Sequence, residues 1–277
     1  GNAQAIFPYD HPALFSMPLA FLVIVVVSKL DRSPRAAKER AAFDAAIAQR
    51  EVLVREVHHR IKNNLQGVAG LLQQHAERHP GVGPMLTEAV SQVQAIAQVY
   101  GLQVGSGGPL RVAHVLQAIA GSVQRTFGRS IHVFTSPEAS QWLMPEAESI
   151  PIALTLNELL TNAIKHGAGD SLRCETDVAP ATLAPGSLRP GGGAAASGDM
   201  VVITIVNRGR LPAGFDLARF PGGLSGLGLA RALLPRRTAT LTLEQQGDDV
   251  VARVLLRTPS VVREAEPAPA PTALASQ

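Results

Sequence analysis

Two long helical patterns joined by a turn constrain the fold of this chain most strongly. From Arg35 to about Gln103 apolar residues recur at helical spacing, with a break at PGVGP, the five residues from Pro80 to Pro84. Proline removes a backbone donor and glycine is costly to order, so both interrupt helices. The sequence therefore predicts a hairpin of two helices with its turn at this stretch.

The first of these helices carries a dense polar segment, VREVHHRIKNNLQ, from Val54 to Gln66. Apolar residues spaced by three or four are typical of a seam between two helices. They are Val54, Val57, Ile61, Leu65, Val68 and Leu72. On this wheel His58 flanks the seam, whereas His59 points away from it, in the company of several cations. An exposed imidazole beside Glu56 is placed to attack a phosphate donor, with the glutamate holding the ring. The alternative is a solvated polar helix face.

Beyond the glycine-rich stretch from Gly105 to Pro109 the pattern changes to shorter elements. Runs of helical period alternate there with runs of alternating apolar residues, which are typical of strands. The predicted elements are helices near Val112–Phe127 and at Ser149–His166, strands at Ser130–Phe134, Val201–Asn207 and Ala239–Thr258, a hairpin turn at QGDD, and a loop at Ala168–Gly198. This mixture predicts an α+β domain after the hairpin.

The second of the predicted helices contains LNELLTNAIKHG, from Leu156 to Gly167. Its polar residues Glu158, Asn162, Lys165 and His166 are three or four apart, or adjacent, and share one helix face. An asparagine amide oxygen suits Mg²⁺, which is held partly through water and substrate phosphates. A lysine can meet a phosphate as a point charge. The alternative is an amphipathic helix with a polar surface.

A glycine-rich segment, GGLSGLGLARALLP, runs from Gly222 to Pro235. Gly226 and Gly228 let backbone amides approach a phosphate, and the helix that begins near Leu229 can present its N-terminus to the same group. A flexible loop is the alternative. The order of the motifs favours phosphate binding, because the segment follows a strand and the helix whose polar residues suit Mg²⁺ and phosphate.

The polar segment EVHHRIKNNLQ resembles the phosphoacceptor box of bacterial sensor histidine kinases, in the subfamily whose box is HHR-x-KNN-LQ. In close relatives one histidine stands here, and it matches His59, which leaves His58 as the second candidate. The helix from Thr87 to Gln103 resembles the partner helix of that family. The resemblance implies that two hairpins dimerise into a four-helix bundle.

LNELLTNAIKHG resembles the N-box of the GHKL-type ATPase fold, which histidine kinases share with gyrase, a heat-shock chaperone and a mismatch-repair protein. The resemblance implies that Asn162 holds Mg²⁺ and that Glu158 positions metal or phosphate or accepts the histidine proton. GGLSGLGLARALLP resembles the second glycine box of that fold. The nucleotide-binding residues implied are Asn162, Lys165, His166, Asn207, Gly209, Gly226, Leu227 and Gly228.

The strand VVITIVN ends at a departure from the family pattern. The family has Asp-x-Gly-x-Gly here, and its aspartate accepts a hydrogen bond from the adenine amino group. This chain has Asn207 in place of the aspartate and Leu211 in place of the second glycine. A neutral amide makes a weaker hydrogen bond than a carboxylate. This departure motivates the alternative of a degenerate kinase.

The run ALFSMPLAFLVIVVVSKL, from Ala13 to Leu30, is uncharged until Lys29. Its length of about eighteen residues is near the lower limit for a helix that spans a membrane. A buried core helix is one alternative. The core of a signal peptide is another, but a signal peptide has basic residues before its apolar run, and none precede this one. The basic flank that follows predicts that the C-terminal side lies in the cytoplasm. Residues 1–44 resemble the end of acetate-type sodium:solute symporters, and transporter–kinase fusions exist as a class. We therefore expect a piece of a longer protein in a bacterial cytoplasmic membrane.

The fold class expected is α+β, with one transmembrane helix, a two-helix dimerisation hairpin and an α/β sandwich that binds ATP. The expected parts are an extracytoplasmic stub at 1–12, the transmembrane helix at 13–30, a helical linker at 31–50, the phosphotransfer hairpin at 51–104, the catalytic domain at 110–260 and a disordered tail at 261–277. The scattered net charge of +3 does not favour nucleic acid as a partner, and the single Cys174 excludes an intrachain disulfide.

The expected activity is that of a membrane-anchored sensor histidine kinase that uses ATP and Mg²⁺. His59 takes the γ-phosphoryl group within a homodimer and passes it to an aspartate on a response regulator. The alternative is a degenerate kinase that acts as a receiver-binding scaffold or phosphatase. A third hypothesis, a transporter fragment with an inert tail, conflicts with the intact order of the boxes.

Overall fold

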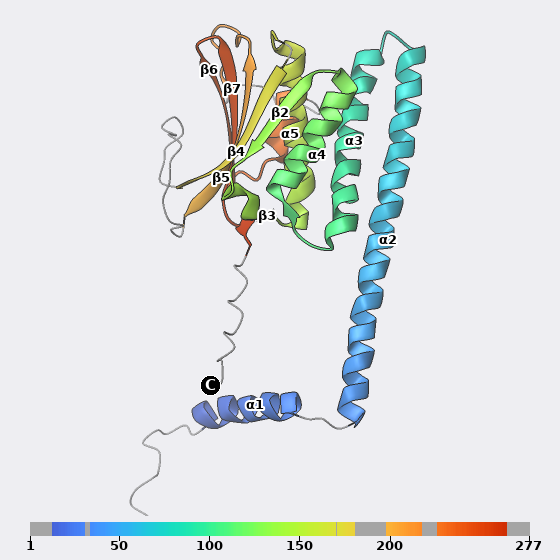
Figure 1. Cartoon of the computed structure of the whole chain (residues 1–277), viewed down its shortest axis with the longest axis vertical. Coiled ribbons are helices and arrows are strands. Elements are labelled where there is room, and N and C mark those ends of the chain that lie inside the picture. The colour runs from blue at the N-terminus through green and yellow to red at the C-terminus, as the bar shows by residue number, and fades with distance from the viewer. Residues whose placement is uncertain (1–12, 31–33, 170, 181–197, 218–225, 265–277) are drawn as a thin grey trace, which may run out of the picture. The chain divides into compact units, whose positions relative to one another are not determined.

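The computed structural model describes residues 13–30, 34–169, 171–180, 198–217 and 226–264, and these form two compact units, residues 1–54 and 55–277. In the first unit α1, Ala13–Leu30, confirms the predicted helix at the predicted bounds (Figure 1). Within the described residues no helix is both long and apolar enough to cross a membrane. The predicted transmembrane helix is therefore not supported. Membrane localisation and the symporter resemblance stay predictions, and the stub at 1–12 lies outside the described residues.

The predicted hairpin is confirmed by two helices, α2, Pro34–Arg78, and α3, Gly83–Ser106. The turn between them is closed by backbone hydrogen bonds, from His79 N to His75 O (3.0 Å) and from Val82 N to His79 O (3.1 Å). Helix α3 ends at Gly107, whose φ of 62° is the left-handed conformation that glycine adopts freely. The expected helical linker at 31–50 forms the first part of α2 from Pro34 onward, and residues 31–33 lie outside the described residues.

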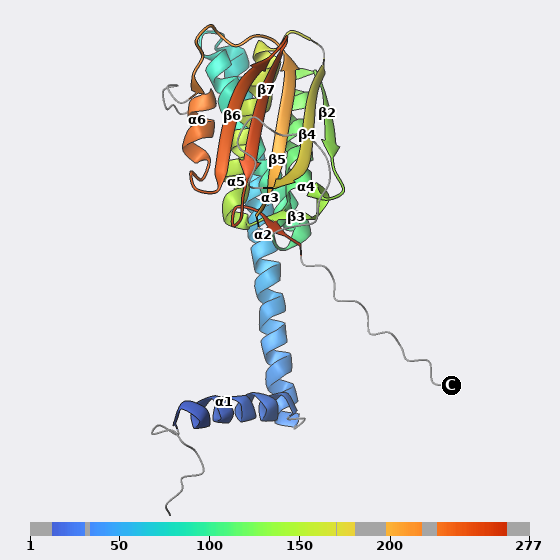
Figure 2. The same cartoon turned by 90° about the vertical axis from the view of Figure 1, so that its left-hand side faces the viewer.

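A five-stranded sheet forms the centre of the second unit, with the strand order β2-β4-β5-β7-β6 (Figure 2). Only the β2–β4 pair is parallel among the described strands, and the other neighbours are antiparallel. The strands are β2, Ser130–Thr135; β4, Ser171–Pro180; β5, Asp199–Arg208; β6, Ala239–Gln246; and β7, Asp249–Leu256. The predicted hairpin turn at QGDD joins β6 to β7.

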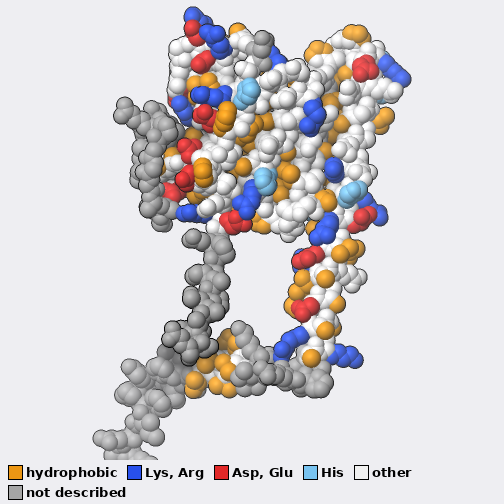
Figure 3. Space-filling view, viewed as in Figure 1, with side chains coloured by type: hydrophobic (Ala, Val, Ile, Leu, Met, Phe, Trp, Pro, Cys, Tyr) orange, Lys and Arg blue, Asp and Glu red, His pale blue; other side chains and the backbone are white. Residues whose placement is uncertain are grey.

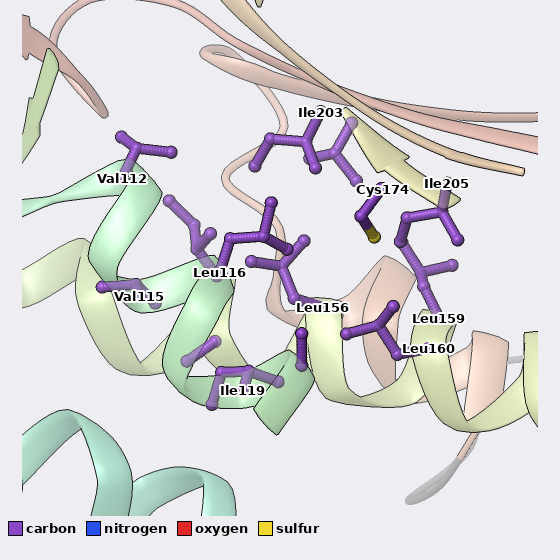
Figure 4. Close-up of a cluster of buried hydrophobic side chains, with 14 of the residues drawn as sticks. Val112, Val115, Leu116, Ile119, Leu156, Leu159, Leu160, Cys174, Ile203 and Ile205 are labelled. Carbon is purple, nitrogen blue, oxygen red and sulfur yellow. The ribbon is translucent and has the colours of Figure 1, made fainter. Parts of the chain in front are cut away.

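Two helices cover one face of this sheet and bury its core (Figures 1 and 2). They are α4, Val112–Phe127, and α5, Glu146–His166. Apolar residues at helical spacing form a stripe along α4. This stripe faces the sheet, because packing against the sheet removes its apolar surface from water. Figure 4 shows Leu116 of α4 and Leu156 of α5 directed toward Ile203 of β5, and Leu159 of α5 beside Ile205, all of them buried. The expected α+β layering is confirmed.

A second, small sheet of order β1-β3-β8 closes the end of this domain. Its strands are β1, Leu110–Arg111; β3, Trp142–Met144; and β8, Val262–Arg263. The short 3₁₀ helix η1, Ala139–Gln141, directly precedes β3. The prediction of a disordered tail from residue 261 is therefore wrong at its start. Val261 is fully buried, and Arg111 pairs with Glu264 at 2.6 Å. Residues 265–277 lie outside the described residues.

The predicted loop at Ala168–Gly198 is also wrong in part, because β4 occupies ten of its residues inside the sheet. Leu172, Cys174 and Thr176 are buried and alternate with more exposed residues, as expected of a strand with one face in the core. The glycine- and proline-rich sequence around them obscured this pattern. Burial raises the pKa of the Cys174 thiol to about 12, so this cysteine is a core residue and not a nucleophile. Helix α5 begins at Glu146, earlier than the predicted Ser149.

Candidate functional site

His59 lies on α2 with an exposed side chain, as the helical wheel predicts. Its Nδ1 atom is 3.2 Å from the side-chain nitrogen of Asn63, one turn further along the helix. Glu56 was expected to hold this ring, and that role stays a prediction. Its carboxylate accepts a hydrogen bond from Arg60 at 2.7 Å, which holds the pKa of Glu56 below its usual value. The residue beside the His59 ring is therefore a neutral amide.

His58 has a different environment, with only 12% of its side chain exposed. Its ring lies 5.5 Å from the ring of Tyr100 on α3, and its Nε2 atom is 3.5 Å from a carboxylate oxygen of Glu146 at the start of α5. A bulky phosphate donor has little room to reach an imidazole enclosed in this way. Of the two adjacent histidines, His59 is the accessible one.

The predicted seam on α2 divides between two faces. Ile61, Leu65 and Leu72 are partly buried in the hairpin, and Ala69, on the same side, is 4% exposed. Other seam residues and their neighbours are exposed: Val54, Val57, Val68 and Leu71, at 45%, 52%, 46% and 62%. Hydrophobic side chains are seen at the surface along α2 (Figure 3). An apolar stripe of this kind along a helix is typical of a surface that a partner covers.

Glu158, the acid of the predicted N-box, lies in the middle of α5 and is only 2% exposed. Both of its carboxylate oxygens accept hydrogen bonds, one from Gln92 Nε2 of α3 at 2.9 Å and one from the backbone amide of Gly226 at 2.8 Å. Gly226 opens helix α6, Gly226–Leu233. The structure thus brings together residues of two predicted nucleotide motifs that are 68 positions apart in the sequence.

Burial raises the pKa of Glu158, although the hydrogen bonds from Gln92 and Gly226 act in the opposite direction. The folded chain therefore binds this proton more readily than the unfolded chain does. We expect wild type to gain stability relative to Glu158→Gln as the pH falls through the raised pKa, and the gain to be complete below the ordinary value of 4.5. Denaturant unfolding of both proteins through the acidic range measures this difference. A difference that is flat, or that grows with rising pH, would contradict it.

Polar contacts between α3 and α5 were not predicted from the sequence. Ser91 Oγ donates to Asn157 Oδ1 at 3.0 Å, and Gln103 Nε2 donates to Ser149 Oγ at 3.4 Å. Together with the Gln92–Glu158 hydrogen bond, these contacts attach α3 along α5. Their partners are 46 to 66 positions apart, so no local pattern could have found them.

The remaining N-box residues lie beyond Glu158 on α5. Asn162 is partly exposed one turn later, and Lys165 and His166 are exposed at the C-terminal end of the helix. Among the described residues no group of three or more metal-ligating histidine, cysteine or acidic side chains occurs. A single amide oxygen fits Mg²⁺ that takes its other ligands from water and phosphate.

Asn207 lies at the end of β5 and is 9% exposed. Its side-chain nitrogen donates to Arg208 O at 3.3 Å. Gly167 and Gly209 pack against this amide, since a Cβ atom on either would lie within 3.4 Å of Asn207 Nδ2. The end of α5 and the end of β5 are thus in contact at the predicted adenine-binding position. A cavity of about 10 Å³, room for about one water, adjoins them.

Arg129 is a further residue of this region that sequence reasoning missed. Its guanidinium donates to Ile164 O at 2.6 Å and to Gly167 O at 3.2 Å. Carbonyl oxygens at a helix C-terminus have no partners within the helix, and a cation there also favours the helix dipole. Arg129 therefore fixes the last turn of α5, from which Lys165 and His166 project.

The glycine box is described from Gly226 onward, and residues 222–225 of the predicted box lie outside the described residues. Gly226 has φ of 63°, a conformation that glycine adopts without strain. Leu227 is partly buried and Gly228 is buried. The N-terminal turn of α6 therefore lies beside Glu158, because the backbone amide of Gly226 donates a hydrogen bond to that carboxylate.

Comparison with known proteins points to one class. The Histidine kinase family model matches residues 56–127. Sensor histidine kinase PdtaS of Mycolicibacterium smegmatis is 27% identical over 126 residues, which cover 44% of this chain and 25% of that protein, and PdtaS of Mycobacterium tuberculosis H37Rv matches to the same extent. The chain thus spans about a quarter of the length of these curated relatives. The histidine kinase domain from the Erythrobacter litoralis EL346 blue-light activated histidine kinase matches with a TM-score of 0.48 at 19% identity, covering 75% of this chain and 94% of that one. The sequence comparisons support a histidine kinase.

Proposed function

We propose that this chain is a sensor histidine kinase of the HHR-x-KNN type with a GHKL-type ATPase domain. It transfers the γ-phosphoryl group of ATP to His59, and from there to an aspartate on a response regulator. The observation that carries the proposal is the hydrogen bond from Gly226 to Glu158, because it joins the N-box to the glycine box. The exposed His59 in the segment that matches histidine kinases supplies the acceptor.

The acceptor chemistry follows from the neighbours of His59. The amide of Asn63 contacts Nδ1, and an amide can present either its nitrogen or its oxygen. With the oxygen turned to the ring, Nδ1 keeps its proton and the Nε2 lone pair faces solvent. Nε2 then bonds to the γ-phosphorus as the bond to the ADP oxygen breaks, and the ring loses a proton. A neutral amide orients this ring but takes no proton, which leaves that step to another base.

The nucleotide would lie along the end of α5. Asn162 offers its oxygen to Mg²⁺, and Lys165 and His166 lie beyond it toward solvent. When bound, Mg²⁺ neutralises charge that develops on the transferred phosphoryl group. Asn207 offers a carbonyl acceptor to the adenine amino group. The amides of α6 bind phosphate oxygens, as helix N-termini do.

The apolar stripe on α2 supports a homodimer as the working form. Val57, Val68 and Leu71 are more than 45% exposed, and a second hairpin would bury them in a four-helix bundle. Light scattering on the purified chain measures this directly. A monomeric mass at micromolar concentration would count against the bundle.

The decisive test incubates the 277-residue chain with γ-labelled ATP and Mg²⁺. We expect a label that is stable to alkali and labile to acid, as a phosphohistidine is, and that passes to a receiver domain. The alternative, a scaffold or phosphatase, is motivated by Asn207 and needs no nucleotide. A folded chain that binds a receiver domain but neither binds ATP nor takes label would establish the alternative instead.

A further inference from the structure

One carboxylate connects the hairpin to the glycine box. Gln92 of α3 donates to one oxygen of Glu158, and the amide of Gly226 donates to the other, at 2.9 and 2.8 Å. Glu158 is 2% exposed, so water does not replace either bond. We call this chain of contacts the Gln92–Glu158–Gly226 bridge. It is the route by which a movement of α3 would reach the start of α6.

The carboxylate in this bridge occupies a place suited to a phosphate oxygen. The first amides of a helix have no partner within the helix, and they attract anions of any kind. Here the anion at the Gly226 amide is a side chain of the same domain. A nucleotide phosphate that binds the start of α6 has to displace it, because one N–H makes one strong hydrogen bond.

We propose that Gln92 is a positioning residue that holds Glu158 against the Gly226 amide, and that the bridge keeps the start of α6 closed to nucleotide phosphate until α3 moves. The proposal rests on the proposed function, since it assigns the start of α6 to phosphate. It adds that the hairpin controls access to that place through a single glutamine. Movement of α3 then frees both the amide for ATP and the carboxylate for its role in transfer.

The charged residues around Glu158 show why a single amide matters. Glu88, one turn before Gln92 on α3, acts by charge repulsion and raises the pKa of Glu158, whereas Lys165 on α5 lowers it. Helix α3 therefore presents one repelling carboxylate and one hydrogen-bond donor to the same acid. Without the donor, the net effect of this part of α3 on Glu158 is repulsive, so the bridge depends on Gln92.

Two substitutions at Gln92 are expected to act in opposite directions. Gln92→Met keeps the length of the side chain but removes the donor, so Glu158 leaves Gly226 more easily. Gln92→Lys supplies a charged donor and strengthens the bridge. We expect the Met variant to bind ATP about tenfold tighter and the Lys variant about tenfold weaker, the scale of one hydrogen bond to a charged group. The KM for ATP should follow the same order. Gln98→Met, a half-buried glutamine on the same helix with no hydrogen bond to Glu158 among the described residues, should change neither.

Hydrogen exchange on the nucleotide-free full chain tests the bridge without ATP. Exchange in the segment 226–233 should be faster in Gln92→Met and slower in Gln92→Lys than in wild type. Unchanged exchange in both variants, or shifts of both in one direction, would overturn the inference and leave the proposed function intact. If wild type and all variants bind no ATP, the proposed function fails, and the competition for Gly226 fails with it. A purely structural role for Gln92 predicts weaker ATP binding in both variants.

Discussion

Replacing His59 with glutamine is expected to reduce phosphohistidine labelling from γ-labelled ATP to background, whereas His58→Gln should remain labelled. The reason lies in the surroundings of the two rings. His59 is exposed beside Asn63, while His58 is enclosed by Tyr100 and Glu146 with 12% of its side chain exposed. Only an imidazole nitrogen that a phosphate donor can reach forms the N–P bond. Acid-labile label on each purified variant is the measurement.

The two variants also differ in the stability that we expect of them. His59→Gln changes an exposed residue, so its thermal unfolding should match that of wild type. His58→Gln loses a ring contact with Tyr100 and should unfold more easily, by about 0.5–1.5 kcal/mol, the usual scale of an aromatic contact. The matched melting curves show that loss of label in His59→Gln is not loss of fold. Label that disappears only in His58→Gln would contradict the assignment.

The helices of this chain could be predicted from the sequence because helical periodicity is a local property. The hairpin with its turn near Pro80 and the helix at Val112–Phe127 follow from residues three or four apart. The strand β4 could not be predicted in the same way. One of its alternating buried residues, Thr176, is polar, and its neighbours in the sheet, β2 and β5, come from distant parts of the sequence.

The residues of the candidate site likewise separate into those that local motifs predict and those that only tertiary packing brings together. His59, Glu158 and Gly226 could be named from motifs, since a motif is a local pattern of side chains. Their partners could not be named, because Gln92 meets Glu158 only through the packing of α3 on α5. The pairing of Glu56 with Arg60 was likewise not anticipated, although both residues belong to the same motif. A glutamate four positions from an arginine on a helix lies within reach of that arginine, and Glu56 accepts a hydrogen bond from Arg60 at 2.7 Å.

Gly167→Ala is expected to lower the free energy of unfolding by about 1–3 kcal/mol, the usual cost of overpacking. A Cβ atom at this position would lie well inside contact distance of the Ala163 carbonyl oxygen and 3.0 Å from Asn207 Nδ2. The backbone oxygen cannot turn aside as a side chain can. The last turn of α5 and Asn207 therefore have to separate, and ATP should bind more weakly because both belong to the proposed nucleotide site.

Gly70→Ala is the matched control for this substitution. Gly70 lies inside α2, and a Cβ atom there meets nothing within 4 Å. Alanine is the better helix former by about 0.8–1.0 kcal/mol, so this variant should be more stable than wild type, with unchanged ATP binding. Denaturant unfolding and nucleotide titration on both variants give the two quantities. If Gly167→Ala is as stable as wild type, the end of α5 does not pack against β5 in solution as it does here. If it is destabilised but binds ATP as wild type does, the nucleotide lies elsewhere than at Asn207.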